Sequence, residues 1–391
     1  MENVESARKQ VSKLMKMKKI LAIVLSIIVG MSIVGCKNTQ NIEPQDDARI
    51  KIVTTLFPYY DFVRAVTKGV DGISITMTVA PGQDSHSFEP TPKDIIKIEN
   101  ADLFIYNGGT LETWVDSVLG ALSNKEQVMR MMDYVDVMEE ETVEGMDLRY
   151  EDSHSHGEKS HNDESEHSHD NDSNEYESQS NLEDGHINDD LEDGHINDDL
   201  EDGHINDDLE DGHSHEDDKE YDEHIWTSPV NAMKMVGYIC DEMVKIDPEN
   251  AETYKENADE YIGKIQNIDT QIRKTVNKMH KKEIIFADKF PLLYFAKEYE
   301  LSYYAAFPGC AEDTEPSART IAFLIDKIKE DKINKVYYLE LSSKAVANTI
   351  CEDTGAKAYE FNSCHNITEK QFESGVTYVD LMTKNLEVLK K

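Results

Sequence analysis

A histidine in a short polar loop is the first residue of this sequence whose type and setting could do chemistry. His86 lies between the acids Asp84 and Glu89 in the loop 81–90, which opens with Pro-Gly and closes with Pro and is therefore stiff and non-helical. The stretch 73–79 before it alternates like a strand. An imidazole presented beyond a strand end, beside carboxylates, can hold a divalent metal.

A second loop histidine, His224, has an acid, Glu223, directly before it and Trp226 close behind it to wall off a pocket. Outside the acidic insertion described below, the chain has only two further histidines, His280 and His365. A lone histidine is more often structural than a ligand. Two loop histidines with adjacent acids, and a His-rich insertion between them, favour metal binding instead; imidazole and carboxylate together suit zinc, and also manganese or iron. His280 follows a predicted helix among lysines and is expected at the surface.

The charge of the chain is concentrated in one segment. The formal net charge is −39, and residues 151–222 hold 29 acids against two lysines, which leaves −12 for the rest. No basic stripe offsets these acids, so we expect no nucleic-acid partner. The nonapeptide that begins at Leu182 recurs twice and then in an altered fourth copy. Each copy has two aliphatic residues and cannot bury a core, so we expect a disordered insertion over 150–221.

The insertion is also rich in histidine. Its imidazoles and carboxylates could collect metal as an auxiliary site; the other interpretation is a solvated acidic linker that grew by repeat slippage. The candidate auxiliary ligands are His154, His156, His161, His167, His169, His186, His195, His204, His213 and His215.

The N-terminus has the order of a targeting segment. Three lysines precede an apolar run over 20–34, which is of signal-peptide length and too short for a full membrane span. The run ends in a stretch that resembles the lipobox of bacterial lipoproteins, with Cys36 as the lipidated residue. We therefore expect a signal peptide over 1–36, a tether over 37–47 and an extracytoplasmic protein anchored by lipid to the bacterial cell membrane. The true start codon is left open.

Four cysteines follow the lipidation site and allow three disulfide pairings, among which the sequence does not choose. They are Cys240, Cys310, Cys351 and Cys364.

Strand-like and helix-like segments alternate in both halves of the chain, which predicts an α/β fold of two domains, each with a parallel sheet flanked by helices. We expect an N-terminal domain over 48–246 that contains the insertion, and a C-terminal domain over 281–391. Strands are expected at 50–57, 73–79, 102–107, within 128–137, and at 283–287, 303–307, 335–340 and 357–362. Helices are expected at 59–67, from Pro92 onward with Thr91 as N-cap, and at 112–122, 231–244, 290–300, 317–330 and 344–354.

One long rigid helix over 247–280 is predicted to join the domains, with Asp247 as its cap and Pro248 in its first position. Apolar residues recur at spacings of three and four from Ala251 to Ile272 and form a one-sided stripe. The stripe is short for a coiled coil and contains Ala and Tyr, so we expect it to pack within a monomer.

Two sequence patterns resemble a known family. The stretch 82–90 is similar to the Gly-x-Asp-x-His-x-x-Glu-Pro loop of metal-binding lipoproteins of ABC importers, the zinc/manganese solute-binding family, and His224-Ile225-Trp226 resembles that family's second histidine motif. The lipobox, the His-rich insertion and the long helix also match. The resemblance implies metal held between two α/β domains by His86 and His224, with Glu89 in support, and delivery to a membrane-embedded ABC permease. The His-rich insertion is typical of zinc-type members, so zinc is favoured over manganese.

The second domain departs from the family pattern. The family offers a third ligand, His or Glu, after the first strand of that domain, where this chain has Asp288 and then Lys289. A protonated lysine is a poor ligand, so Asp288 becomes the candidate. The family's fourth position, an acid, has no clear match, and His365 could supply an imidazole there.

Two further residues are weaker candidates. We expect Glu340 to orient a ligand or cap a helix, and Cys310 to pack or form a disulfide.

The resulting hypothesis is a non-enzymatic solute-binding lipoprotein that captures zinc and delivers it to the permease. A manganese- or iron-binding member of the same family is one alternative. A zinc-dependent hydrolase with Glu89 as base is another, although the sequence has no His-Glu-x-x-His pattern. An adhesin or surface metal buffer that works through the insertion alone is a third.

Overall fold

The computed structural model describes residues 48–83, 85, 87–122, 127–146, 220–309 and 315–391. Several predicted features lie outside these residues: the signal peptide and tether with Cys36, the ligand His86, Cys310, and the ten histidines of the insertion. No helix in the described part of the chain combines the length and the apolar character that a membrane crossing requires.

The first domain contains a four-stranded parallel sheet in the order β2-β1-β3-β4. Its strands are β1 (Ile50–Thr54), β2 (Ile73–Met77), β3 (Leu103–Tyr106) and β4 (Val128–Arg130). The helices of this part of the chain are α2 (Phe57–Val66), α3 (Pro92–Glu99), α4 (Trp114–Ala121) and α5 (Pro229–Ile246), with a 3₁₀ turn, η1, at Thr110–Glu112. Thr91 caps α3 in a reciprocal capping box with Asp94, as its sequence predicts.

The second domain repeats this topology, with a parallel sheet in the order β6-β5-β7-β8. Its strands are β5 (Glu283–Phe290), β6 (Ser302–Pro308), β7 (Lys335–Leu339) and β8 (Lys357–Phe361). Its helices are α7 (Leu293–Tyr299), α8 (Ala318–Asp331), α9 (Ala345–Thr354), α10 (Glu369–Glu373) and α11 (Tyr378–Lys390). The predicted fold class of two parallel-sheet α/β domains is therefore confirmed, and each sheet directs the carboxyl ends of its strands to one edge, where ligands of such folds bind.

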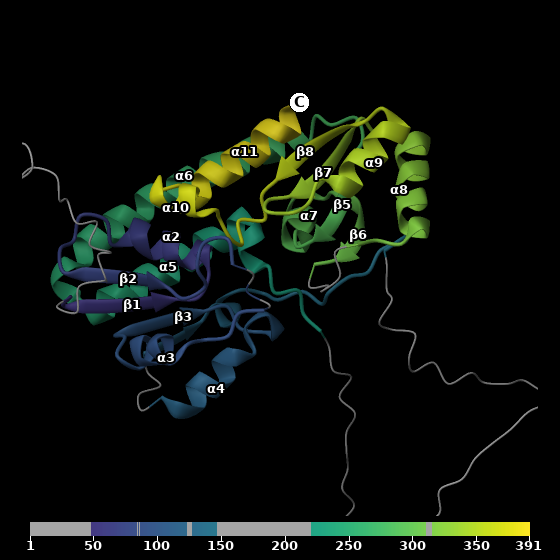
Figure 1. The fold of residues 1–391 in the computed structure, drawn as a ribbon. Helices are drawn as coiled ribbons and strands as arrows, with labels where there is room; N and C mark the ends of the chain where they lie inside the picture. The colour runs from purple at the N-terminus through teal and green to yellow at the C-terminus, as the bar shows by residue number, and fades with distance from the viewer. Residues whose placement is uncertain (1–47, 84, 86, 123–126, 147–219, 310–314) are drawn as a thin grey trace, which may run out of the picture. The chain divides into compact units, whose positions relative to one another are not determined.

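The long helix α6 (Ala251–Val276) lies between the two domains in the sequence and packs against both. Its predicted stripe is buried from Tyr254 to Ile272. It contacts α2 and α5 of the first domain and α7 and α11 of the second, and α11 runs beside it (Figure 1). One apolar cluster continues from the first sheet across α6 to the second sheet, so α6 is a shared part of the core.

The start of α6 differs from the prediction. Residues Pro248–Asn250 form a separate 3₁₀ turn, and the Asp247 side chain makes no capping hydrogen bond to the backbone. Instead its Oδ2 accepts hydrogen bonds from Arg49 at 2.8 Å and from Tyr254 at 2.6 Å. The predicted cap was wrong because these side chains compete for the carboxylate, and Arg49 is 198 positions away in the sequence.

The structure differs from the prediction at two other elements. Strand β5 extends to Phe290 and does not end before Asp288. The amphipathic helix α11 was not predicted at all.

Among the described cysteines, Cys240, Cys351 and Cys364 are free thiols. No disulfide pairing is therefore seen in the described part of the chain. The domain boundaries remain a prediction.

Candidate metal centre

A cavity of about 300 Å³ gathers four of the predicted site residues: His224, Asp288, Glu340 and His365. It is lined from the loop after β2, from the end of β5, and from the loops that follow β6, β7 and β8. The lining residues are Gly82, Gln83, Ser85, His224, Asp288, Lys289, Pro291, Gly309, Leu339, Glu340, Leu341, Ser342, Ser363, His365 and Asn366. Gln83 and Ser85 precede the predicted ligand His86 in the same loop, so the described part of that loop reaches this cavity. Glu89 is exposed and does not line it.

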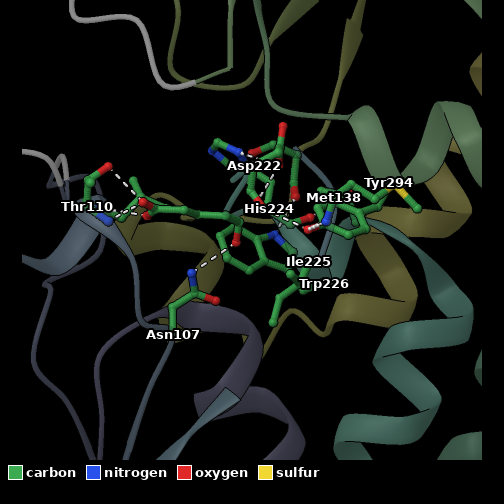
Figure 2. Close-up of polar contacts among 12 residues, drawn as sticks. Asn107, Thr110, Met138, Asp222, His224, Ile225, Trp226 and Tyr294 are labelled. Atoms are coloured by element: carbon green, nitrogen blue, oxygen red, sulfur yellow. Dashed lines mark hydrogen bonds and ion pairs between the residues drawn. The ribbon is translucent and has the colours of Figure 1, made fainter. Parts of the chain in front are cut away.

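His224 is held by a carboxylate. The residue is 1% exposed, its Nδ1 lies 3.2 Å from Asp222 Oδ1, and its backbone N–H donates to the same oxygen at 2.8 Å. Asp222 is itself buried, and its main chain accepts a hydrogen bond from the Tyr294 hydroxyl at 2.7 Å (Figure 2). A carboxylate oxygen accepts, so Nδ1 is the donor in this pair, and in a neutral imidazole with that tautomer Nε2 keeps its lone pair. Metal-binding histidines in proteins characteristically have such a carboxylate partner.

Glu223 clamps the His224 segment to the first domain. Its carboxylate accepts hydrogen bonds from the backbone N–H and hydroxyl of Thr110 and from the N–H of Leu111, which lie in η1 (Figure 2). Its carbonyl accepts from Asn107 Nδ2 at 2.9 Å. The acid before the histidine was recognised in the sequence, but its partners, more than a hundred positions away, were not.

The clamp requires a glycine and rests on a second buried acid. Gly109 has φ +82°, and a Cβ there would overlap the Glu223 carboxylate. Glu112 Oε2 accepts from the N–H of Asn107 at 2.8 Å and of Gly108 at 3.3 Å. Burial raises the pKa of Glu112 to about 7 and also raises the pKa of Glu223.

His365 is supported through a hydroxyl. Glu340 accepts hydrogen bonds from Ser363 N at 2.7 Å and Ser363 Oγ at 2.5 Å, and Ser363 Oγ accepts from His365 N at 3.1 Å. Burial raises the pKa of Glu340 to about 7. Glu340 therefore supports the backbone of His365 through the Ser363 side chain. Cys364, with φ +61°, makes the turn between Ser363 and His365.

The two described histidines of the cavity, His224 and His365, approach each other from different segments of the chain. Their ring centroids are 6.0 Å apart, and Trp226 packs against both rings. Trp226 Nε1 also donates to the Ser363 carbonyl at 2.9 Å, which ties the two loops together. The Nε2 of His365 lies 2.8 Å from Ser85 Oγ, next to His86 in sequence.

Asp288 faces the cavity but is also engaged by the backbone. Its Oδ1 accepts from Lys289 N at 2.8 Å and its Oδ2 from Leu339 N at 3.2 Å. Each carboxylate oxygen can accept more than one bond, so a lone pair remains on each. Among the residues that the structure describes, no group of three His, Cys, Asp or Glu side chains is close enough to hold a metal ion.

Two α/β domains with a long helix between them, and a cavity lined by histidines at the carboxyl ends of their strands, define the class of two-domain solute-binding proteins. The sequence model of the ZnuA family, described as zinc-uptake complex component A periplasmic, matches residues 52–391, and the chain belongs to this family. The family is one of solute-binding components for zinc uptake, which are not enzymes.

Named relatives agree with this assignment. The chain is 30% identical over 370 residues to the high-affinity zinc uptake system protein ZnuA of Bacillus subtilis (strain 168), covering 95% of this chain and 96% of that one. It is 29% identical over 377 residues to the zinc-binding lipoprotein AdcA of Streptococcus pneumoniae (strain ATCC BAA-255 / R6), covering 96% of this chain but 61% of AdcA. The chain thus spans about three fifths of the length of that relative.

A solved structure is similar as well. The Zn(II)-bound ZnuA-like domain of Streptococcus pneumoniae AdcA is 26% identical and matches with a TM-score of 0.58, covering 87% of this chain and 97% of that domain.

Proposed function

We propose that this protein captures zinc outside the cytoplasm and delivers it to a membrane-embedded ABC permease. The observation that carries the proposal is the buried His224–Asp222 pair, because His224 lines a cavity that His365 also lines. Zinc prefers imidazole and carboxylate ligands, and a carboxylate behind the imidazole both fixes its tautomer and raises its basicity. The zinc-binding relatives support zinc as the cargo.

The proposed ligands are His86, His224, His365 and Asp288, with Glu340 orienting the His365 loop. Together they would enclose the ion with protein groups once His224, His365 and Asp288 come closer to one another than they lie in this structure. Such a closed site suits a protein that binds and releases metal without performing chemistry on a bound water. His86 would come from the loop that already carries Gln83 and Ser85 to the cavity.

The remaining parts of the proposal concern the setting. A lipid on Cys36 would hold the protein, as a monomer, at the outer face of the cell membrane, near its permease. The ten histidines of the insertion would bind metal weakly and raise its local concentration. The domain limits 48–246, 247–280 and 281–391 then describe two binding halves and their connecting helix.

Zinc titration of the full chain and of a variant that lacks residues 154–215 tests the assignment. We expect the high-affinity site to survive the deletion, while the number of weakly bound zinc ions falls. Loss of the high-affinity site with the insertion would show that the cavity is not the capture site.

A further inference from the structure

Gly82, Gln83 and Ser85 line the cavity and are hydrogen-bonded to the rest of the protein through one short segment. Within the part of the chain that the structure describes, each hydrogen bond that these residues make outside their own loop goes to Asn366 or His365. Their remaining hydrogen bonds close turns within that loop. A segment with so few connections opens locally at a much lower free energy than the whole domain unfolds. How readily this side of the cavity opens therefore depends on these contacts.

The Asn366 side chain supplies two of the contacts. Its Oδ1 accepts a hydrogen bond from Gly82 N at 3.2 Å, and its Nδ2 donates to the Gln83 carbonyl. The same Oδ1 accepts from Ile367 N at 2.7 Å, which helps to orient the amide. An amide side chain offers an acceptor and a donor side by side, which matches the N–H of Gly82 and the carbonyl of Gln83. Asn366 thus anchors the Gly82–Gln83 backbone to the loop that follows β8.

The segment that carries Asn366 is itself firmly held. The Glu340 carboxyl group accepts hydrogen bonds from Ser363 N and Ser363 Oγ, and the Ser363 carbonyl accepts one from Trp226 Nε1. On the other side of Asn366, Ile367 is buried and belongs to the apolar core. Asn366 is therefore the fixed partner, and the Gly82–Gln83 backbone is the part that can separate from it.

The contact of Ser85 differs in kind, because it falls on a proposed ligand. Ser85 Oγ lies 2.8 Å from His365 Nε2. A ring nitrogen that is hydrogen-bonded to a hydroxyl group cannot bind zinc at the same time, so this contact competes with the metal wherever Nε2 is the ligand atom. The Asn366 contacts involve no ring nitrogen and no carboxylate, so they can persist unchanged when zinc is bound.

A contact that is equally strong in the free and the zinc-bound protein has a defined effect. It leaves the equilibrium affinity unchanged, because only differences in free energy between two states shift the equilibrium between them. It does slow the local opening through which zinc enters and leaves.

We propose that Asn366 is a positioning residue that slows both the entry of zinc into the cavity and its release, by anchoring the Gly82–Gln83 backbone. This inference rests on the proposed zinc-capture function and concerns the regulation of that same site. The affinity for zinc is then set by the ligands, and the rate of zinc exchange is set by Asn366.

Stopped-flow measurements on the full chain test this. Zinc is kept below one equivalent, so that the high-affinity site fills before the histidines of the insertion. Association is followed by tryptophan fluorescence, since Trp226 packs against the rings of both described histidines of the cavity, and dissociation by an excess of a chromophoric chelator. We expect Asn366→Ala to raise both rate constants about tenfold, the size of one or two neutral hydrogen bonds, and to change the Kd by less than about threefold.

Amide hydrogen exchange gives a second measurement, which needs no zinc. The Gly82 N–H donates to Asn366, so in Asn366→Ala it should exchange about tenfold faster, by the same change in free energy. The amides of the core strand β5 should exchange as in wild type. Asn348→Ala, at an exposed position of α9, is the matched control and should keep wild-type rates in both experiments.

The outcomes separate the two proposals. Zinc dissociation from Asn366→Ala at the wild-type rate would overturn the role of Asn366 alone, because zinc capture by the wild-type protein would stand. So would a weaker affinity with an unchanged association rate, which would make Asn366 a support of the ligands. Faster exchange of the β5 amides would assign the effect to the whole fold and would also contradict the proposal. Absence of high-affinity zinc binding in the wild-type protein would overturn zinc capture, and the control of zinc exchange with it.

Discussion

The two described histidines of the cavity are supported in different ways. His224 is 1% exposed and meets the Asp222 carboxylate directly, on a segment that Glu223 fastens to the first domain. His365 is half-buried; its backbone is held through the Ser363 hydroxyl, and its imidazole reaches Ser85 of the first domain. His224 is therefore fixed by buried partners from its own domain, whereas the imidazole of His365 is held in part by a contact to the loop after β2.

The largest expected effect is the loss of zinc affinity when either histidine of the cavity is removed. His224→Ala should weaken zinc binding more than ~100-fold, because it removes a ligand, whereas loss of a ligand's supporting partner alone costs ~10–100-fold. His365→Ala should cost less, because that imidazole is less rigidly held. Calorimetric zinc titration of both variants measures the difference. Equal losses would show that the two histidines are organised to the same degree.

The pH dependence of stability tests the protonation of Glu112, the buried acid next to the contacts of Glu223. Burial raises the folded-state pKa of Glu112 from 4.5 to about 7, so the folded protein favours its protonated form. This contribution to stability is complete below pH 4.5 and is lost as the pH rises through 7. The loss is at most about 3 kcal/mol, at 1.36 kcal/mol per pKa unit.

Glu112→Gln should remove this pH dependence, since the amide oxygen can still accept from the N–H groups of Asn107 and Gly108. Urea unfolding of both proteins at pH 5 and pH 8 provides the comparison, and we expect the variant to be the more stable protein at pH 8. If the change in the free energy of unfolding between pH 5 and pH 8 were the same in wild type and in Glu112→Gln, Glu112 would be ionised in the folded protein.

The carboxylate behind His224 should have a smaller effect than the ligand itself. Asp222→Asn preserves the shape of the side chain but replaces a charge that stabilises the imidazole N–H, and zinc affinity should fall ~10–100-fold. Asp241→Asn, at an exposed position of α5, is the matched control and should bind zinc as wild type does. A fall below threefold in Asp222→Asn would contradict the role of the pair.

The same contrast explains what the sequence could predict. His224 was identifiable because the acids and the tryptophan beside it are local, and the α/β alternation and the buried stripe of α6 were visible as periodicities. The role of Glu223 could not be predicted, because its partners in η1 lie over a hundred positions earlier in the sequence. The shift in the register of β5 between Phe286 and Lys289 arises from pairing with β6, which no local pattern encodes.

One omission had a signal. The pattern of α11 is that of an amphipathic helix, so a helix prediction there would have succeeded. Its buried residues recur at short helical spacings and are Tyr378, Leu381, Met382, Asn385, Leu386 and Leu389. The buried polar member, Asn385, accepts a hydrogen bond from Asn362 N at 2.7 Å and so positions the segment that leads to His365.

The smallest expected effect concerns Gly109, which lies against the Glu223 carboxylate. Gly109 and Gly82 have φ of +82° and +81°, so alanine strains the backbone at either position by ~1–3 kcal/mol, and the ψ of −164° at Gly109 lies in a region that is essentially restricted to glycine. Only at Gly109 would the added Cβ meet a neighbour, the Glu223 carboxylate; at Gly82 nothing lies within 4 Å. Gly109→Ala should therefore destabilise the protein by roughly 1 kcal/mol more than Gly82→Ala, as expected for modest overpacking against a movable side chain.

Urea unfolding of the two alanine variants measures this difference in stability. Zinc titration shows whether the substitution at Gly109 also changes the zinc affinity of the cavity. If Glu223 holds His224 in place, Gly109→Ala should weaken zinc binding as well as stability, because the displaced carboxylate releases the N–H groups of η1. Equal destabilisation by the two substitutions would mean that the clamp yields without cost. His224 would then owe its fixed position to Asp222 alone.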